Sequence, residues 1–265
     1  MNKLKLLNLG CGNHFHKEWV NIDFSSFSEY VTAHNLLEGI PFEDNEIDVI
    51  YHSHVLEHFS KVQAKSFIDQ CYRVLKENGT IRICVPDLEN LIKTYLNCLN
   101  NCLAGNKDAQ ADYNWIMLEL FDQSIRTVPG GGMFEYFKKD INNENFIKSR
   151  IGAEVAGIKA ACQNNISPKL LKPYKLKFWK NKIKKLLFGK DIEYAELGKF
   201  RSQGEIHQWM YDRFSIKNLL ESCGFKNIEF KTYNDSSIEN WNIYELDILN
   251  NTERRPNSLY VEAKK

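Results

Sequence analysis

A short apolar run that ends at a pair of glycines is the feature that most constrains the fold of this chain. Residues 4–9 are mostly apolar, and Gly10-Cys11-Gly12 follows them directly. A run of this length is typical of a parallel strand that is buried on both faces. Glycines after such a strand let the backbone turn tightly and come close to a ligand. The sequence therefore predicts the first strand and turn of an α/β fold.

Strand and helix patterns alternate through much of the remaining chain. Apolar runs predict further strands over residues 20–24, 47–52, 80–85, 227–232 and 258–263. The helical spacing of apolar residues predicts helices over residues 61–76 and 215–222. Because strands alternate with helices, we predict an α/β fold with a doubly wound, mostly parallel sheet.

A long segment without strand patterns interrupts this alternation. Residues 88–204 show mostly helix-like sequence patterns, so we expect a large helical insertion between the fifth and sixth strands of the sheet. The predicted domains are a core formed by residues 1–87 and 205–265 and a helical insertion, or cap, formed by residues 88–204.

The composition limits the classes of protein to which the chain can belong. Hydrophobic residues make up 43% of the chain, which is enough for a proper core. The formal net charge of +1 gives no support to a nucleic-acid partner. The seven cysteines form no Cys-x-x-Cys pair, which is typical of a reducing cytoplasm. No apolar run approaches the roughly 20 residues that a membrane span needs.

The spacing around the glycines argues against a dinucleotide ligand. The third glycine of the dinucleotide fingerprint would fall on Phe15, and Asp23 lies 13 residues after Gly10 instead of about 20. An ionised carboxylate only accepts hydrogen bonds, so Asp23 suits the two hydroxyls of a ribose. The pattern favours an adenosyl ligand without phosphate. The alternative is a plain tight turn with Asp23 as a surface acid.

A set of motifs in a fixed order carries a family resemblance. Leu-Asn-Leu-Gly-Cys-Gly, Val-Asn-Ile-Asp, Val-Leu-Glu-His-Phe and Arg-Val-Leu-Lys-Glu-Asn-Gly follow one another along the chain. Over residues 4–87 and 205–264 the sequence resembles the class I S-adenosylmethionine-dependent methyltransferases. The resemblance implies a Rossmann-like methyltransferase fold, S-adenosyl-L-methionine as cofactor and S-adenosyl-L-homocysteine as product.

The resemblance also implies the residues that bind the cofactor. The turn would line its methionine and ribose, the acid after the second strand would hold the ribose hydroxyls, and later residues would flank the adenine and close the pocket. These residues are Asn8, Gly10, Cys11, Gly12, Asp23, Phe24, Asn35, Leu36, His52 and Ser53. Asn8 and Asn35 stand where the family often has an acid, so charge-assisted hydrogen bonds are lost there.

Three histidines lie within the eight residues 51–58. His54 and His58 are four residues apart and share a face if a helix starts there. The order of residues differs from the zinc-protease motif His-Glu-x-x-His, so we predict no metal site. His54 follows the strand whose end normally points at the transferred methyl, and an imidazole can take a proton near neutral pH. His54 is therefore a candidate base, or else it only shapes the pocket through a backbone hydrogen bond.

The segment His207-Gln208-Trp209-Met210-Tyr211-Asp212 extends the resemblance. It is similar to segments of bacterial methyltransferases encoded with glycosyltransferases, which implies a sugar hydroxyl of a surface polysaccharide, or of its precursor, as acceptor. His207 is then a second candidate base, and His58, Trp209 and Tyr211 are candidate acceptor-binding residues. The alternative for Trp209 and Tyr211 is simple packing. The loop Pro129–Gly132 is flexible by composition and suits either a lid or a linker.

A lysine-rich stretch over residues 169–190 includes several aromatic and aliphatic residues. It suits contact with a membrane surface, and hence a lipid-linked saccharide acceptor handled at the inner membrane face, or else a solvated face over a packed stripe. Two other functions stay open. One is methylation of a lipid or small metabolite, and the other is a non-catalytic, cofactor-binding scaffold in a glycan assembly complex.

Overall fold

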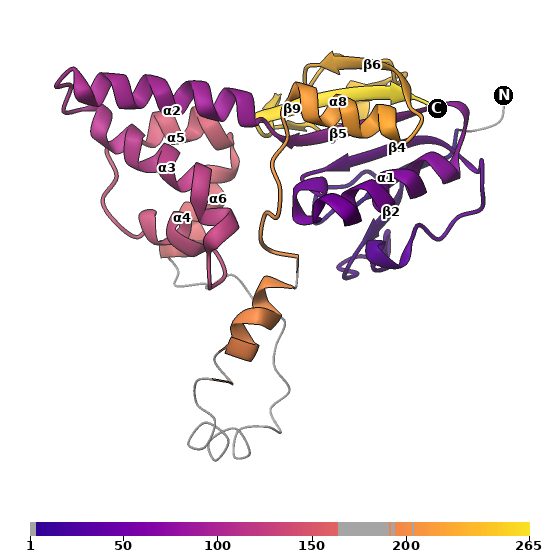
Figure 1. Ribbon diagram of the computed structural model, residues 1–265, viewed down its shortest axis with the longest axis horizontal. Coiled ribbons are helices and arrows are strands. Elements are labelled where there is room, and N and C mark those ends of the chain that lie inside the picture. The colour runs from indigo at the N-terminus through magenta and orange to yellow at the C-terminus, as the bar shows by residue number, and fades with distance from the viewer. Residues whose placement is uncertain (1–3, 164–190, 192–193, 203) are drawn as a thin grey trace. The chain divides into compact units, whose positions relative to one another are not determined.

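The computed structural model describes residues 4–163, 191, 194–202 and 204–265 (Figure 1). The chain divides into two compact units. The first comprises Met1–Lys93, Lys148–Ala153 and Gln208–Lys265, and the second comprises Thr94–Ile147 and Glu154–His207. The lysine-rich stretch 169–190 lies outside the described residues. Within the part of the chain that the structure describes, we find no helix with the length and apolar character that crossing a bilayer requires.

A seven-stranded sheet forms the centre of the first unit. Its strands run in the order β3-β2-β1-β4-β5-β9-β6. Strand β9 is antiparallel to both of its neighbours, and the other pairs are parallel. The strands are β1 (Leu6–Leu9), β2 (Val20–Asp23), β3 (Val31–Ala33), β4 (Ile47–Ser53), β5 (Leu75–Pro86), β6 (Lys226–Lys231) and β9 (Ser258–Lys264). The predicted α/β fold with a doubly wound, mostly parallel sheet is confirmed.

Two helices cover one face of this sheet, α1 (Lys61–Val74) and α8 (Arg213–Ser222) (Figure 1). Ser60 and Gln63 form a capping box that begins α1. The helix ends two residues before the predicted boundary, because Leu75 already pairs with Ile47 in the sheet. The buried side chains of both helices join those of the strands in the main hydrophobic core.

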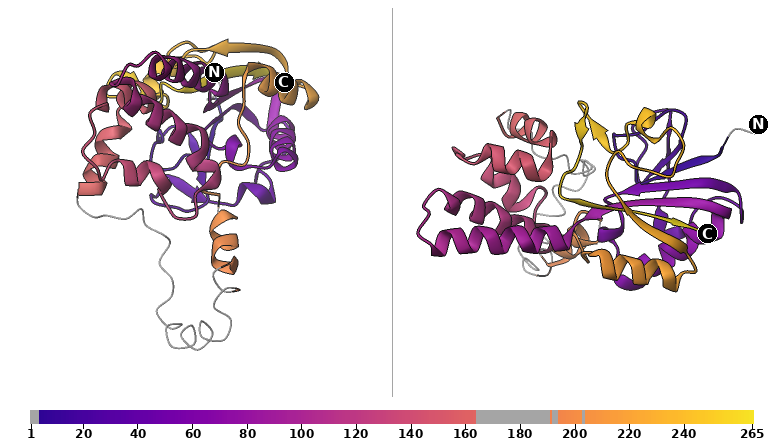
Figure 2. Two further views of the ribbon diagram at one scale, coloured as in Figure 1. Left: turned by 60° about the vertical axis from the view of Figure 1, so that its left-hand side comes forward. Right: turned by 90° about the horizontal axis from the view of Figure 1, so that it is seen from above.

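The connection between β6 and β9 covers the opposite face of the sheet. It contains η4 (Trp241–Tyr244), β7 (Ile248–Leu249) and β8 (Thr252–Glu253). Figure 2 shows this layering from above, with α8 on one side of the sheet and the connection on the other. Trp241 and Trp19 form a second apolar cluster with strand residues such as Tyr51.

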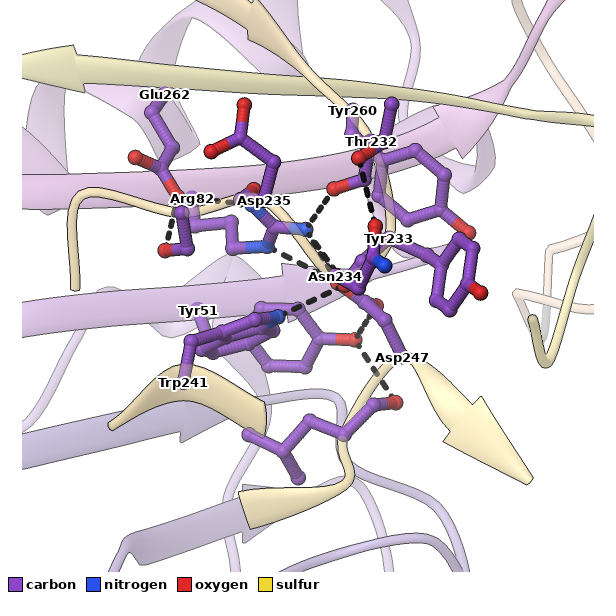
Figure 3. A network of polar contacts seen from close by, with 12 residues as sticks. Tyr51, Arg82, Thr232, Tyr233, Asn234, Asp235, Trp241, Asp247, Tyr260 and Glu262 are labelled. Carbon is purple, nitrogen blue, oxygen red and sulfur yellow. Dashed lines mark hydrogen bonds and ion pairs between the residues drawn. The ribbon is translucent and has the colours of Figure 1, made fainter. Parts of the chain in front are cut away.

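Arg82 fastens this connection to the sheet (Figure 3). Its guanidinium is fully buried and donates to Glu262 at 2.8 Å and to Asp247 at 3.0 Å. It also donates to the backbone carbonyls of Thr232 and Asp235. The hydroxyl of Tyr51 donates to the second oxygen of Asp247 at 2.6 Å, so both carboxylate oxygens have partners. All charges of this buried network are paired, as burial away from water requires.

The described residues between β5 and β6 are mainly helical. The helices are α2 (Leu88–Leu103), α3 (Ala109–Ile125), α4 (Gly131–Tyr136), α5 (Glu144–Ile151) and α6 (Glu154–Gln163). No strand occurs among the described residues of the range 88–204. The predicted large helical insertion between the fifth and sixth strands is thereby confirmed.

The glycines of the loop Pro129–Gly132 meet two acids of the second unit, the buried Asp122 and the half-buried Glu205. Gly132 donates its N–H to Asp122, and Gly130 donates to Glu205 at 3.1 Å. A Cβ on Gly131 would overlap the Asp122 carboxylate, and the φ of Gly131 is +52°. The glycines therefore allow α4 to begin directly against Asp122, where any side chain would clash.

Candidate functional site

The order of strands reverses between β1 and β4. Ligands of open α/β sheets bind beside the carboxyl ends of the strands at such a switch point. Residues 10–12 follow β1 directly, Asp23 is the last residue of β2, and Ser53 is the last residue of β4. The fold thus gathers these predicted cofactor residues at one edge of the sheet.

The loop Gly10–Gly12 turns back onto the end of β2. Gly10 and Cys11 donate their N–H groups to the carbonyl of Ile22 at 2.8 and 3.2 Å. Both glycines have positive φ, +65° and +54°. A Cβ on Gly10 would overlap Val55, whereas a Cβ on Gly12 would meet nothing within 4 Å. Gly10 is therefore required by the close approach of Val55, and the loop is open at Gly12, where a ligand can approach the backbone.

Asp23 connects this loop to β2 through its side chain. Its Oδ2 accepts the N–H of Gly12 at 2.8 Å, and its Oδ1 lies 3.4 Å from the N–H of Ser25, a long hydrogen bond. The carboxylate keeps acceptor capacity for a diol, since each of its oxygens has two lone pairs. Phe24 follows with 66% of its surface exposed, available to an aromatic ligand.

Cys11 contributes a neutral thiol to the loop. Burial, helped by the charge of Asp23, raises the pKa of this thiol to about 12. A thiolate is the nucleophilic form of cysteine, so Cys11 acts as a small apolar side chain and not as a nucleophile.

Asn8 forms a buried amide pair with Asn21. The Nδ2 of Asn8 donates to Oδ1 of Asn21 at 3.1 Å, and Asn21 in turn donates to the carbonyl of Trp19 at 2.9 Å. A carboxylate at position 8 has no proton to donate, so it would leave the Asn21 oxygen without this partner. The pairing gives a physical reason for an amide where the family often has an acid.

Asn35 and Leu36, predicted to flank adenine, lie at the short helix η1 (Leu36–Glu38). The Oδ1 of Asn35 accepts the N–H of Leu37 at 3.1 Å, and its Nδ2 donates to Glu38 at 3.0 Å. Leu36 is half-buried and packs on the main core. Asn35 thus has a local capping role, and its contact with a cofactor stays a prediction.

The side chain of His52 lies in the main core. Its ring packs at 5.2 Å from the ring of Phe67 on α1, and it is fully buried. Burial lowers the pKa of His52 to about 3, so the imidazole is neutral. Neither of its ring nitrogens has a hydrogen-bond partner among the described residues. The ring of His52 therefore packs in the core, and contact of its backbone with a cofactor at the end of β4 stays a prediction.

His54 occupies a strained position directly after β4. Its φ is +55°, a left-handed value that few residues other than glycine adopt. Its N–H donates to the carbonyl of Cys84 at 2.9 Å. Nδ1 lies 3.1 Å from Oε1 of Glu57, and Nε2 lies 2.9 Å from Oγ of Ser258. Both ring nitrogens thus have side-chain partners.

Glu57 is the most deeply buried acid of this region, with 0% of its surface exposed. Burial raises the pKa of Glu57 to about 8, against the opposing charge of Arg255. Perturbed carboxyls of this kind are enriched in functional sites. Glu57 and Ser258 were not among the predicted site residues. The order His54-x-x-Glu57 is visible in the sequence, but Ser258 lies 204 residues from His54 and only the fold brings it near.

The expectation that His54 and His58 share a helix face is not met. The 3-10 helix η2 covers only Leu56–His58, and His54 precedes it in a left-handed conformation. The carbonyl of His58 accepts a hydrogen bond from the side chain of Gln208 at 2.8 Å.

The later motif runs beside η2. Gln208 and Trp209 donate their N–H groups to the carbonyl of Glu57 at 2.7 and 3.2 Å. Trp209 is 40% exposed, with the Nζ of Lys61 3.8 Å from its ring centre. Tyr211 is only 3% exposed and belongs to the main core. His207 belongs to the second unit, where its N–H donates to the carbonyl of Gln123 at 3.0 Å.

Comparisons with known proteins bear on the first unit. Residues 13–83 match a family model described as "Methyltransferase domain". A solved S-adenosylmethionine-dependent methyltransferase from Archaeoglobus fulgidus is 13% identical, with a TM-score of 0.42 over 100% of this chain and 87% of that one. Another, from Thermotoga maritima and described as a possible histamine N-methyltransferase, is 11% identical, with a TM-score of 0.39 over 100% and 84%. No curated protein matches the sequence.

These TM-scores lie below 0.5, so the similarity to known proteins rests on the family match over residues 13–83. The strand order and the glycine loop after β1 are those of a Rossmann-like sheet. The segment that matches the methyltransferase domain contains Asp23 and the strands β2, β3 and β4. The open space at Gly12 and the acceptor oxygens of Asp23 fit S-adenosylmethionine as cofactor.

Proposed function

We propose that this protein is an O-methyltransferase whose acceptor is a sugar hydroxyl of a surface polysaccharide or of its precursor. The observation that carries the proposal is the imidazole of His54 beside the cofactor loop. Val55, the next residue, packs so closely on Gly10 that a Cβ there would overlap it. Transfer to a hydroxyl needs a group that takes the proton, and an imidazole is suited to that task.

The cofactor side of the reaction uses residues of the first unit. The backbone of Gly10–Gly12 and the carboxylate of Asp23 would hold the methionine and ribose, and Phe24, Asn35 and Leu36 would surround the adenine. When bound, S-adenosylmethionine supplies an electrophilic methyl carbon on its sulfonium. Much of the rate then comes from positioning the acceptor oxygen in line with that carbon.

Trp209 supports a saccharide acceptor. Its indole is 40% exposed, and its backbone is tied to the segment that carries His54 through the hydrogen bond to Glu57. Sugar rings stack on exposed aromatic rings through their apolar faces. Lys61 contacts the Trp209 ring, so a sugar would use the remaining ring surface. Tyr211 is buried and supports the site by packing.

The experiment has two stages. Calorimetry with S-adenosylhomocysteine tests the cofactor site, and we expect saturable binding that Asp23→Ala abolishes. Transfer of labelled methyl groups to a panel of methyl glycosides, glycerolipids and small hydroxylated metabolites then tests the acceptor. Labelling of a glycoside supports the proposal.

Other results would lead to other functions. Labelling of a lipid or metabolite alone would favour the second acceptor class. Tight cofactor binding without transfer to any of the probes, together with unchanged methyl-sugar content in a deletion strain, would favour a non-catalytic scaffold. A lipid-linked acceptor would give the lysine-rich stretch 169–190 its proposed contact with the membrane surface.

A further inference from the structure

Three side chains, two of them close in sequence and one distant, form a continuous array of polar contacts at the edge of the sheet. Glu57 lies on η2, His54 lies at the end of β4, and Ser258 is the first residue of β9. The distances are 3.1 Å from Glu57 to Nδ1 of His54 and 2.9 Å from Nε2 to the Ser258 hydroxyl. All three residues belong to the first unit.

From this geometry we infer that Glu57, His54 and Ser258 form a proton relay in which the Ser258 hydroxyl meets the acceptor and Glu57 holds the imidazole in place. The inference rests on the proposed methyl transfer and names the groups that would carry its proton. Glu57 is a positioning residue, because it acts on the acceptor only through His54.

The three groups differ in exposure, and this indicates which end of the array meets the acceptor. The carboxylate is fully buried, the His54 side chain is 13% exposed, and Ser258 is half-buried. Above about pH 8 Glu57 is ionised, and a carboxylate at Nδ1 then stabilises the imidazole tautomer that carries its proton there, which leaves a lone pair on Nε2. The Ser258 hydroxyl can donate to that lone pair and at the same time accept from an incoming hydroxyl.

The step balances without a further reactant. The acceptor oxygen forms a bond to the methyl carbon, and the carbon–sulfur bond breaks with its electron pair staying on sulfur. The acceptor proton moves to the Ser258 oxygen while the Ser258 proton moves to Nε2 of His54. The products are a methyl ether, S-adenosylhomocysteine and a protonated His54 next to Glu57, and the proton then leaves to water.

Two observations favour this role over simple packing. The left-handed backbone of His54 carries a steric cost that nearby hydrogen bonds must offset. A carboxyl group with no exposed surface is also costly to bury, and an apolar residue of similar size would pack there more cheaply. Both unfavourable features lie in the segment around Val55, which packs against Gly10.

Nuclear magnetic resonance of the full chain with ¹⁵N-labelled histidine tests the relay without an acceptor. The His54→Gln variant identifies the His54 signals. With S-adenosylhomocysteine present, we expect His54 to carry its proton on Nδ1 above pH 8, where Glu57 is ionised. Glu57→Gln should shift the His54 tautomer toward Nε2 at that pH, because the carboxylate that accepts the Nδ1 proton is lost. A proton on Nε2 in the wild-type protein above pH 8 would overturn the relay.

Ser258 variants test the other end of the relay with the best glycoside of the panel. Ser258→Ala should lower kcat about tenfold or more and leave the His54 tautomer unchanged, and Ser258→Thr should restore most of the rate. Ser222→Ala, which removes an exposed hydroxyl bonded to Leu219, is the matched control. An unchanged kcat in Ser258→Ala would overturn the role of Ser258.

Cofactor affinity separates this inference from the proposed function. We expect the variants at positions 57 and 258 to bind S-adenosylhomocysteine like the wild type. Failure of the wild type to bind it would remove the proposed function, while the tautomer of His54 would still be measured. Normal binding with the wrong tautomer would remove the relay alone.

Discussion

Gly12 donates its backbone N–H to Oδ2 of Asp23 over 2.8 Å, and this bond joins the loop after β1 to the end of β2. The same carboxylate that we expect to bind the ribose therefore also fixes the loop that we expect to line the methionine. Binding of the cofactor at one end of the site and the shape of the loop at the other depend on a single side chain.

This shared role predicts the effect of Asp23→Asn. The amide oxygen can still accept the Gly12 N–H, so the fold should persist, but a charged acceptor for the ribose is lost. We expect affinity for S-adenosylhomocysteine to fall about tenfold or more, measured by calorimetry. Asp69→Asn, at an exposed ion pair with Lys65 on α1, is the control and should bind normally. Equal affinities of the two variants would contradict the role of Asp23.

The two loop glycines predict different outcomes for the same substitution. Gly10→Ala would overlap Val55 and should destabilise the protein strongly, seen as a large fall in melting temperature. Gly12→Ala meets no atom within 4 Å, so its cost should be about 1–2 kcal/mol from the left-handed backbone alone. Its methyl would instead enter the open side of the loop. Normal cofactor affinity in a folded Gly12→Ala variant would mean that the ligand does not lie there.

Local patterns in the sequence predict most of the sheet, and the exceptions have physical causes. The strand β3 (Val31–Ala33) has three residues, of which two are exposed, so it shows no apolar run. The strand β5 starts at Leu75 because pairing with Ile47 in the sheet overrides the helical pattern that precedes it. Both features depend on neighbours that are distant in sequence.

The candidate site is predictable only in part for the same reason. The loop Gly10–Gly12 and Asp23 are close in sequence, and their spacing identifies them before the fold is known. The ring of His52 points into the core against Phe67 of α1, because alternate residues of a strand face opposite sides of the sheet, and no local signal shows which face a given residue of β4 takes. Ser258 reaches His54 only through the pairing of β9 with β5.

The buried network of Arg82 predicts a large loss of stability in Arg82→Met. Removal of the guanidinium leaves the carboxylates of Asp247 and Glu262 buried without their main partner. We expect the free energy of unfolding to fall by about 3–5 kcal/mol, measured by urea denaturation. Lys93→Met breaks the exposed pair with Glu89 and should cost less than about 1 kcal/mol. Similar losses in both variants would show that burial does not determine how much the Arg82 network contributes to the free energy of unfolding.

His52 predicts a stabilising substitution. Its two ring nitrogens are buried without a partner among the described residues, so His52→Leu should raise the free energy of unfolding at pH 7 by about 1 kcal/mol. The pKa of His52 falls from 6.5 to about 3 on folding, so its neutral ring costs stability as the pH drops below 6.5. The advantage of the variant should therefore grow between pH 6.5 and pH 3. A fall in cofactor affinity would instead show that the ring serves the site.

The raised pKa of Glu57 predicts a pH dependence of stability that is opposite in sign to that of His52. Its pKa rises from 4.5 to about 8 on folding, so between these values the folded protein holds a proton that the unfolded chain releases. The stability that Glu57 contributes is complete below pH 4.5 and is lost as the pH rises through about 8. Each unit of pKa shift corresponds to about 1.36 kcal/mol of stability.

Glu57→Gln removes this titration, because an amide does not ionise. Relative to the wild type, the variant should gain stability steadily from pH 5 to pH 8.5, as followed by melting temperature. Its methyl-transfer rate should fall below that of the wild type above about pH 8, where the wild type has the carboxylate that keeps the His54 proton on Nδ1 and the lone pair on Nε2 free. Glu77→Gln, at an exposed position, should follow the wild type in both measurements. A variant that loses stability as the pH rises would show that the carboxylate of Glu57 is ionised and stabilising in the folded protein, against the expected sign.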